Sequence, residues 1–135
     1  LGESPAASLL LHARNLIASK TGHYSDALVK KNTELVVNAL RSNRITTLTH
    51  PGDKGKVDLD AVFRACAETG TYLEISSRHR QLTVDEIKMA AAYDVKFIMG
   101  SDAHISEKVG TCGPAVSRML EAGLDPERVV NLIEY

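Results

Sequence analysis

Apolar residues recur at helical spacing in several segments of the chain, and short apolar runs separate these segments. Residues 25–43 place Leu28, Leu35 and Leu40 at multiples of about 3.6 positions, which predicts an amphipathic helix. Further helices are predicted from their end signals: 58–70, which ends at a glycine; 83–94, which opens with a Thr–Glu capping box; 114–123, which opens at a proline; and 127–135, which follows an Asp–Pro start.

The short runs between these helices predict strands. Residues 44–50 are rich in β-branched side chains, and residues 71–76 and 95–101 are largely apolar. A fourth strand is predicted at 13–19 (Ala-Arg-Asn-Leu-Ile-Ala-Ser). Alternating strands and helices indicate a parallel sheet, because parallel strands need crossover connections. We therefore expect an α/β fold in a single domain, residues 1–135. Its N-terminal segment, 1–24, precedes strand–helix repeats at 25–135.

Composition and charge argue against nucleic acid and membranes as binding partners. The 135 residues are 44% hydrophobic and 24% charged, with a net charge of −1, so there is no basic surface for nucleic acid. No run reaches the roughly 18 apolar residues of a membrane helix. Cys66 and Cys112 lie far apart and form no CxxC motif. We expect two reduced, structural thiols in a cytoplasmic protein without a membrane partner.

Polar side chains gather where the predicted strands end. His50 ends the first strand, Glu74 lies within the second, residues 76–80 follow it, and Asp102 and His104 follow the third. Neighbouring strands lie within about 5 Å of each other, so these groups can converge at one edge of the sheet. Imidazole and carboxylate suit zinc, manganese or iron, which lower the pKa of a bound water molecule. An arginine beside them would complement a phosphate.

Each of these residues also has a purely structural interpretation. Asp102 can cap a turn, His79 can be a surface residue, and His23 can be a solvated loop histidine. A metal-free α/β domain that binds a nucleotide or sugar phosphate is a further alternative, although no glycine-rich phosphate loop follows a predicted strand. Glu74 is the hardest to explain by structure, because a carboxylate facing an interior needs a partner. The convergence of three strand ends favours a shared polar site.

Four short motifs along the chain form a set. They are Thr-His-Pro-Gly at 49–52, Tyr-Leu-Glu-Ile-Ser-Ser-Arg-His-Arg at 72–80, Phe-Ile-Met-Gly-Ser-Asp-Ala-His at 97–104 and Glu-Lys-Val-Gly at 107–110. This set resembles the C-terminal half of the PHP (polymerase and histidinol phosphatase) domain. It is most similar to small stand-alone bacterial phosphoesterases of the YcdX type and to the PHP domain of bacterial family X DNA polymerases. The resemblance spans about residues 32–131.

The resemblance implies a fold and an activity. The fold is a distorted (β/α)7, TIM-like barrel, of which this chain would be the C-terminal portion. The activity is phosphate ester hydrolysis by metal-bound hydroxide, at a cluster of up to three zinc, manganese or iron ions at the strand ends. The expected substrate is a small-molecule phosphate ester, and a nucleic acid substrate is not expected in a chain with four Tyr, two Phe and no Trp.

The resemblance also assigns roles to side chains. His50 matches the metal ligand that precedes Pro-Gly. Asp102 and His104 match the last Asp-x-His pair, which holds different metals of the cluster and is catalytic. The remaining matches are Arg78, or else His79 or Arg80, as contacts to the substrate phosphate, and Glu74 as a residue that orients a ligand or an arginine.

Several ligands that the resemblance implies are missing from the chain. No His-x-His occurs, and a further His and a bridging acid would also lie before residue 1. Another expected His falls at Lys20-Thr21; His23 stands two residues later, so either it replaces this ligand or the ligand is absent. Half a barrel needs its other half, a second subunit or another chain to close it. Because the chain begins with Leu, we expect the parent protein to be longer.

Two functions compete on this evidence. The first is a metal-dependent phosphoesterase, with this chain as the C-terminal part of the catalytic domain. The alternative is a non-catalytic PHP remnant that acts as a binding or scaffold module, which the missing His-x-His favours. Stoichiometric metal in the purified protein would discriminate between the two.

Overall fold

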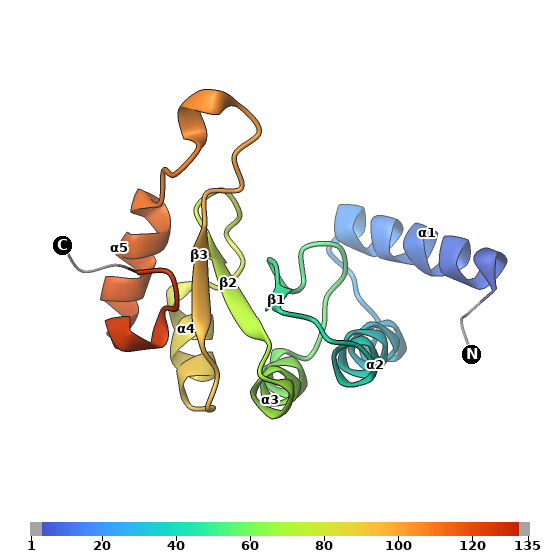
Figure 1. Ribbon diagram of the computed structural model, residues 1–135. Helices are drawn as coiled ribbons and strands as arrows, with labels where there is room; N and C mark the ends of the chain where they lie inside the picture. Colours follow the sequence, from blue (N-terminus) through green and yellow to red (C-terminus); the bar gives the residue numbers. More distant parts are fainter. Residues whose placement is uncertain (1–3, 133–135) are drawn as a thin grey trace.

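The computed structural model describes residues 4–132, and within them helices alternate with short strands (Figure 1). In chain order the elements are α1 (Pro5–Thr21), α2 (Asp26–Ser42), β1 (Thr47–Leu48), α3 (Leu59–Thr69), β2 (Tyr72–Ser76), α4 (Val84–Ala91), β3 (Phe97–Gly100), the 3-10 helix η1 (Ser106–Lys108), α5 (Gly113–Ala122) and the 3-10 helix η2 (Pro126–Arg128).

The three strands form one parallel sheet in the order β1-β2-β3, as the alternation of elements predicts. Thr47 pairs with Tyr72, and Leu73 pairs with Phe97. The strand predicted at 44–50 is much shorter than expected, because pairing with β2 covers only Thr47 and Leu48. The predicted second and third strands are confirmed.

Helices pack against one face of this sheet. In Figure 1 the helices α2, α3, α4 and α5 follow one another along it, each in contact with the next. Leu73, Ile75, Phe97 and Met99 belong to the buried core on the helical side. Because side chains alternate along a strand, Glu74 faces the opposite side. The arrangement is α/β and is consistent with part of a barrel.

End signals in the sequence correctly locate most helices. Asp58 accepts hydrogen bonds from the first turn of α3, and Gly70 ends that helix in the left-handed conformation. Thr83 and Glu86 form the predicted capping box of α4, although this helix ends at Ala91 instead of reaching residue 94. Gly123 ends α5. These local hydrogen bonds satisfy backbone groups that a helix end leaves free.

The strand predicted at 13–19 is wrong, because these residues lie inside α1. Ser4 caps this helix, Pro5 occupies its first turn, and Gly22 ends it. Alanine and leucine favour a helix between such end signals. On α1, Asn15 is buried against Asn32 of α2, and each side-chain amide donates to the other's oxygen, at 2.9 and 2.7 Å. This amide pair holds α1 against α2.

The helix predicted at 127–135 is wrong over its described part. Asp125 caps only the short helix η2, and Val129 then forms a bridge with Phe97. The Val130 amide donates to the Phe97 carbonyl oxygen at 2.9 Å. The segment after η2 therefore pairs with the free edge of β3 instead of continuing as a helix. Residues 133–135 of the predicted helix lie outside the described residues.

The largest core side chains come from both layers: Phe63 and Ile87 from the helices, and Phe97, Leu73 and Ile75 from the sheet. Cys66 is fully buried among them, and burial raises the pKa of its thiol to about 12. Over residues 4–132, the helices are all too short or too polar to cross a membrane.

Candidate metal centre

Three loops at the carboxyl edge of the sheet carry the candidate site. They follow β1, β2 and β3, so parallel pairing brings them together. His50 and Asp102 lie at the starts of the first and third loops, and both have positive φ angles, of 29° and 47°. Non-glycine residues rarely adopt this conformation, and it concentrates at functional sites. The backbone therefore turns sharply where each of these side chains enters the site.

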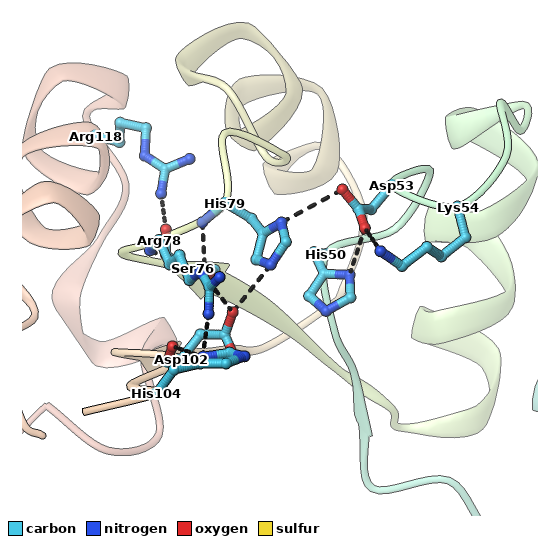
Figure 2. A network of polar contacts seen from close by, with 9 residues as sticks. All are labelled: His50, Asp53, Lys54, Ser76, Arg78, His79, Asp102, His104 and Arg118. Carbon is cyan, nitrogen blue, oxygen red and sulfur yellow. Dashed lines mark hydrogen bonds and ion pairs between the residues drawn. The ribbon is translucent and has the colours of Figure 1, made fainter. Parts of the chain in front are cut away.

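His50, Asp53 and His79 form a compact cluster (Figure 2). One ligand atom from each residue lies within 4.8 Å of the others. The imidazole rings of His50 and His79 stack, with their centroids 4.3 Å apart. Among the residues that the structure describes, these three make up a potential cation site with two imidazoles and one carboxylate.

His79 lies between two carboxylates. Its Nδ1 is 3.4 Å from Oδ1 of Asp53, and its Nε2 is 2.9 Å from Oδ2 of Asp102. Histidines that bind metals commonly turn their second nitrogen toward a carboxylate, which fixes the ring. His79 has this arrangement, with Asp102 as the carboxylate behind it.

The two aspartates have buried oxygens that fit a cation. Oδ2 of Asp53 and Oδ2 of Asp102 are buried and accept no hydrogen bond from the described residues. Lys54 Nζ lies 2.8 Å from Asp53 Oδ2 and forms an ion pair with it, but the two groups are not aligned for a hydrogen bond. The nearby Lys54 ammonium is the main cause that lowers the pKa of Asp53, so this carboxylate is charged at neutral pH. Buried, charged oxygens beside imidazoles suit zinc, manganese or iron.

Ser76 fixes the loop that carries His79. Its buried Oγ accepts hydrogen bonds from the backbone N–H groups of Arg78 and His79, at 3.3 and 3.2 Å. The Ser77 amide also donates to the Gly100 carbonyl oxygen at 2.8 Å, which joins the end of β2 to the end of β3. These hydrogen bonds set the direction in which the Arg78 and His79 side chains leave the loop.

Arg78 and His104 lie on the more exposed side of the site. The Arg78 guanidinium contacts Nδ1 of His104 and has its Nε 4.0 Å from Asp102 Oδ2. His104 Nδ1 also lies 2.9 Å from the Asp102 carbonyl oxygen. Together with Ser77 and Lys108, these residues line a pocket of about 480 Å³. A pocket with a guanidinium and an ammonium group at its wall can take an anion.

The structure brings His50, His79 and Asp102 together, places Arg78 and His104 beside Asp102, and leaves His23 and Arg80 apart. His104 is 63% exposed and lies outside the cluster. His23 is exposed in the turn between α1 and α2, where its amide donates to Thr21 Oγ1. Arg80 is exposed in the loop after β2.

Glu74 is nine-tenths buried although it faces away from the helices. Its Oε2 has no hydrogen-bond partner among the described residues, and its Oε1 lies over Gly100. A side chain at Gly100 would overlap this oxygen, so the glycine leaves room for the carboxylate. The role predicted for Glu74, to orient a ligand or an arginine, stays a prediction.

Asp53 is the site residue that sequence reasoning missed. The backbone N–H of Asp53 donates to the His50 carbonyl oxygen at 3.2 Å, so the chain turns back within four residues. The signal was present: Pro-Gly after a histidine predicts a tight turn that returns the next residue toward that histidine.

Comparison with known proteins finds relatives that are named as probable phosphatases. One from Syntrophotalea carbinolica is 32% identical over 117 residues, which is 80% of this chain and 49% of the relative. Others come from a Thermoanaerobacter species (29% identical; 76% of this chain and 46% of the relative) and from Shewanella oneidensis (28% identical; 74% and 43%). The chain thus spans about half the length of the curated relatives it matches. No family model matches it.

Proposed function

We propose that this chain is the C-terminal part of the catalytic domain of a metal-dependent phosphoesterase of the PHP type. The observation that carries the proposal is the His50–Asp53–His79 cluster at the carboxyl edge of a parallel sheet, with a buried carboxylate oxygen on Asp53 and another on the adjoining Asp102. Relatives named probable phosphatases support the reaction class.

In this proposal His50, Asp53 and His79 bind a zinc, manganese or iron ion. When bound, such an ion polarises a phosphate oxygen and lowers the pKa of a water molecule. His79 binds through the nitrogen that faces Asp53, because its other nitrogen faces Asp102 at 2.9 Å. The Asp102 carboxylate keeps the imidazole oriented. Asp102 and His104 stay proposed as ligands of further ions in the complete site.

Arg78 binds the substrate phosphate. Its guanidinium lies beside Asp102 and His104 at the wall of the 480 Å³ pocket, and half of its side chain is exposed to solvent. A guanidinium can donate two parallel hydrogen bonds to a phosphate. The pocket then accommodates the rest of a small phosphate ester. Arg80 and His79 were the other candidates for this contact, and the position of His79 between two aspartates favours a role toward the cation instead.

The test is to measure metal content and the hydrolysis of p-nitrophenyl phosphate with manganese or zinc in the purified full-length protein. His79→Ala and Asp53→Asn should each lower both bound metal and kcat/KM by at least about tenfold. His12→Ala, which removes an exposed imidazole from α1, is the matched control and should change neither.

Three outcomes would count against the proposal. A wild-type protein without stoichiometric metal would overturn it. Metal bound without hydrolysis would favour the binding module over the enzyme. Activity that survives both His79→Ala and Asp53→Asn would show that the cluster is not the reaction centre.

A further inference from the structure

Arg118 of α5 binds the backbone of the loop that follows β2. Its Nη1 donates to the carbonyl oxygens of Arg80, Gln81 and Leu82, at 3.2, 3.1 and 2.9 Å, and its Nη2 donates to the Ser76 carbonyl oxygen. Figure 2 shows the guanidinium pointing at Ser76 from the side opposite the cluster. One side chain thus holds both ends of the loop 77–82.

The Arg118 guanidinium binds mainly this loop. It is half-buried, and burial lowers the pKa of Arg118. The hydrogen bonds of its side chain within the described residues all go to carbonyl oxygens: the four in or beside the loop, and Pro114 at 3.5 Å on its own helix. A planar fork of N–H donors suits several carbonyl oxygens at once.

The loop needs such a restraint. Leu82, its last residue, has a φ of 55° although it carries a side chain, and it is fully buried. Residues in this conformation persist only where their surroundings enforce it. Its carbonyl oxygen accepts the shortest of the three Nη1 hydrogen bonds. At the other end of the loop, the Oγ of Ser76 holds the amides of Arg78 and His79.

We propose that Arg118 is a positioning residue, which holds the loop 77–82 so that His79 stays stacked on His50 and between Asp53 and Asp102. That this positioning matters for metal binding and catalysis rests on the proposed function. The connection is short: Arg118 fixes the Ser76 carbonyl, the Ser76 hydroxyl fixes the His79 amide, and the His79 ring joins the cluster.

Arg128 provides a matched control. It is also half-buried, and within residues 4–132 its guanidinium hydrogen bonds also go to carbonyl oxygens, those of Ala91, Tyr93 and Val95, while its Cζ lies 5.5 Å from the Phe97 ring centroid. These carbonyls lie at the end of α4 and in the turn that leads to β3, at the opposite edge of the sheet from the cluster. Arg128→Met therefore also removes a guanidinium that binds backbone carbonyls, but from a place that cannot position His79.

The test compares Arg118→Met with Arg128→Met and the wild type, first in metal-free protein. Amide hydrogen exchange over residues 77–82 should be about tenfold faster in Arg118→Met alone. The nuclear Overhauser effect between the His50 and His79 rings, whose centroids lie 4.3 Å apart, should be lost in the same variant alone. Manganese should then bind about tenfold more weakly to Arg118→Met and unchanged to Arg128→Met.

Unchanged exchange and an intact ring contact in Arg118→Met would overturn the inference, and so would equal changes in Arg128→Met. Altered exchange with unchanged manganese affinity would reduce Arg118 to a structural residue and also overturn it. Should Arg118→Met fail to fold, Arg118→Lys keeps the charge but not the planar fork, and should show the same changes at smaller size. A wild type that binds none of manganese, zinc and iron would overturn the proposed function, whereas the metal-free measurements would still decide this inference.

Discussion

The two cysteines are chemically distinct. Cys66 is fully buried in the core, where burial raises the pKa of its thiol to about 12, whereas Cys112 is half-buried before α5. The thiolate is the reactive form, so Cys66 is protected both by access and by protonation. We expect Ellman's reagent to modify one thiol per folded chain and two after denaturation. In Cys112→Ser the folded chain should not react, and a fast-reacting Cys66 would contradict this.

Asp60, Tyr93 and Arg64 form a second group of interacting polar residues. The Tyr93 hydroxyl donates to Asp60 Oδ1, and this hydrogen bond is the main cause that lowers the pKa of Asp60 from its ordinary 3.8. Arg64 Nη2, 2.8 Å from Asp60 Oδ2, lowers it further. The folded state thus favours the charged carboxylate. This stabilisation is complete above the ordinary pKa and is lost as pH falls through the lowered one.

Tyr93→Phe should raise the pKa of Asp60 toward 3.8, measured by carboxyl carbon chemical shifts. The part of the stability difference between wild type and Tyr93→Phe that comes from Asp60 should be present at neutral pH and should be lost as the pH falls through the lowered pKa of Asp60. Urea unfolding at several pH values measures this difference. A difference that grows on acidification would show that another interaction of Tyr93 dominates.

At the level of single residues, sequence reasoning predicted positions better than contacts. His50, Asp102 and Glu74 follow from where the strands end, because parallel strands bring their carboxyl ends to one edge. The residues that each of these side chains contacts could not be predicted from the strand ends. The position of His79 against Asp53 depends on how two loops curl, and positive φ angles at His50 and Asp102 are not readable from residue type.

At the level of elements, α1 and α2 meet the loop after β1 at one buried point. The amides of Asn15 and Asn32 bind each other there, and Asn32 Nδ2 also donates to the Lys56 carbonyl oxygen at 3.0 Å. Gly55 packs directly against this pair. A Cβ at this residue would lie 2.6 Å from Asn15 Oδ1 and 2.9 Å from Asn32 Nδ2.

Gly55→Ala should therefore lower the free energy of unfolding by about 1–3 kcal/mol, because a hydrogen-bonded amide pair has little freedom to move. Chemical denaturation measures the loss. Gly113→Ala is the control, since a Cβ there has no atom within 4 Å, and it should cost much less. Equal effects of the two substitutions would mean that the Asn15–Asn32 pair yields easily.

Helix ends were predictable because they depend on a few neighbouring residues, as at Thr83–Glu86 and Gly123. The two wrong elements have different causes. Residues 13–19 contain a strand-like Asn-Leu-Ile, but the cap at Ser4 and the buried partner Asn32 favour a helix. Residues 127–132 carry helix signals, but the unpaired edge of β3 offers backbone hydrogen bonds that a local pattern cannot reveal.

At the level of the whole molecule, the proposed ion would connect two separate loops. His50 and Asp53 come from the loop after β1, and His79 comes from the loop after β2. An ion bound only in the folded state stabilises it, by about 2.7 kcal/mol at a concentration a hundred times its Kd.

Manganese or zinc should therefore raise the Tm of the protein, and EDTA should reverse the change. In His79→Gln most of this rise should be lost, whereas His12→Ala should keep it. Calorimetry or fluorescence-monitored melting measures the shifts. A rise of equal size in His79→Gln would mean that the ion binds elsewhere.

The left-handed backbone at His50 and Asp102 lowers the stability of the fold at two residues whose side chains are proposed to bind or orient a cation. Glycine adopts this conformation without a steric penalty, so His50→Gly or Asp102→Gly would relax the fold while removing an imidazole or a carboxylate. A directed-evolution experiment that selects for heat resistance alone should enrich glycine at both positions, and a selection that also demands cation binding should reject it. Substitutions chosen only to relieve backbone strain would therefore first remove the side chains of the candidate metal site.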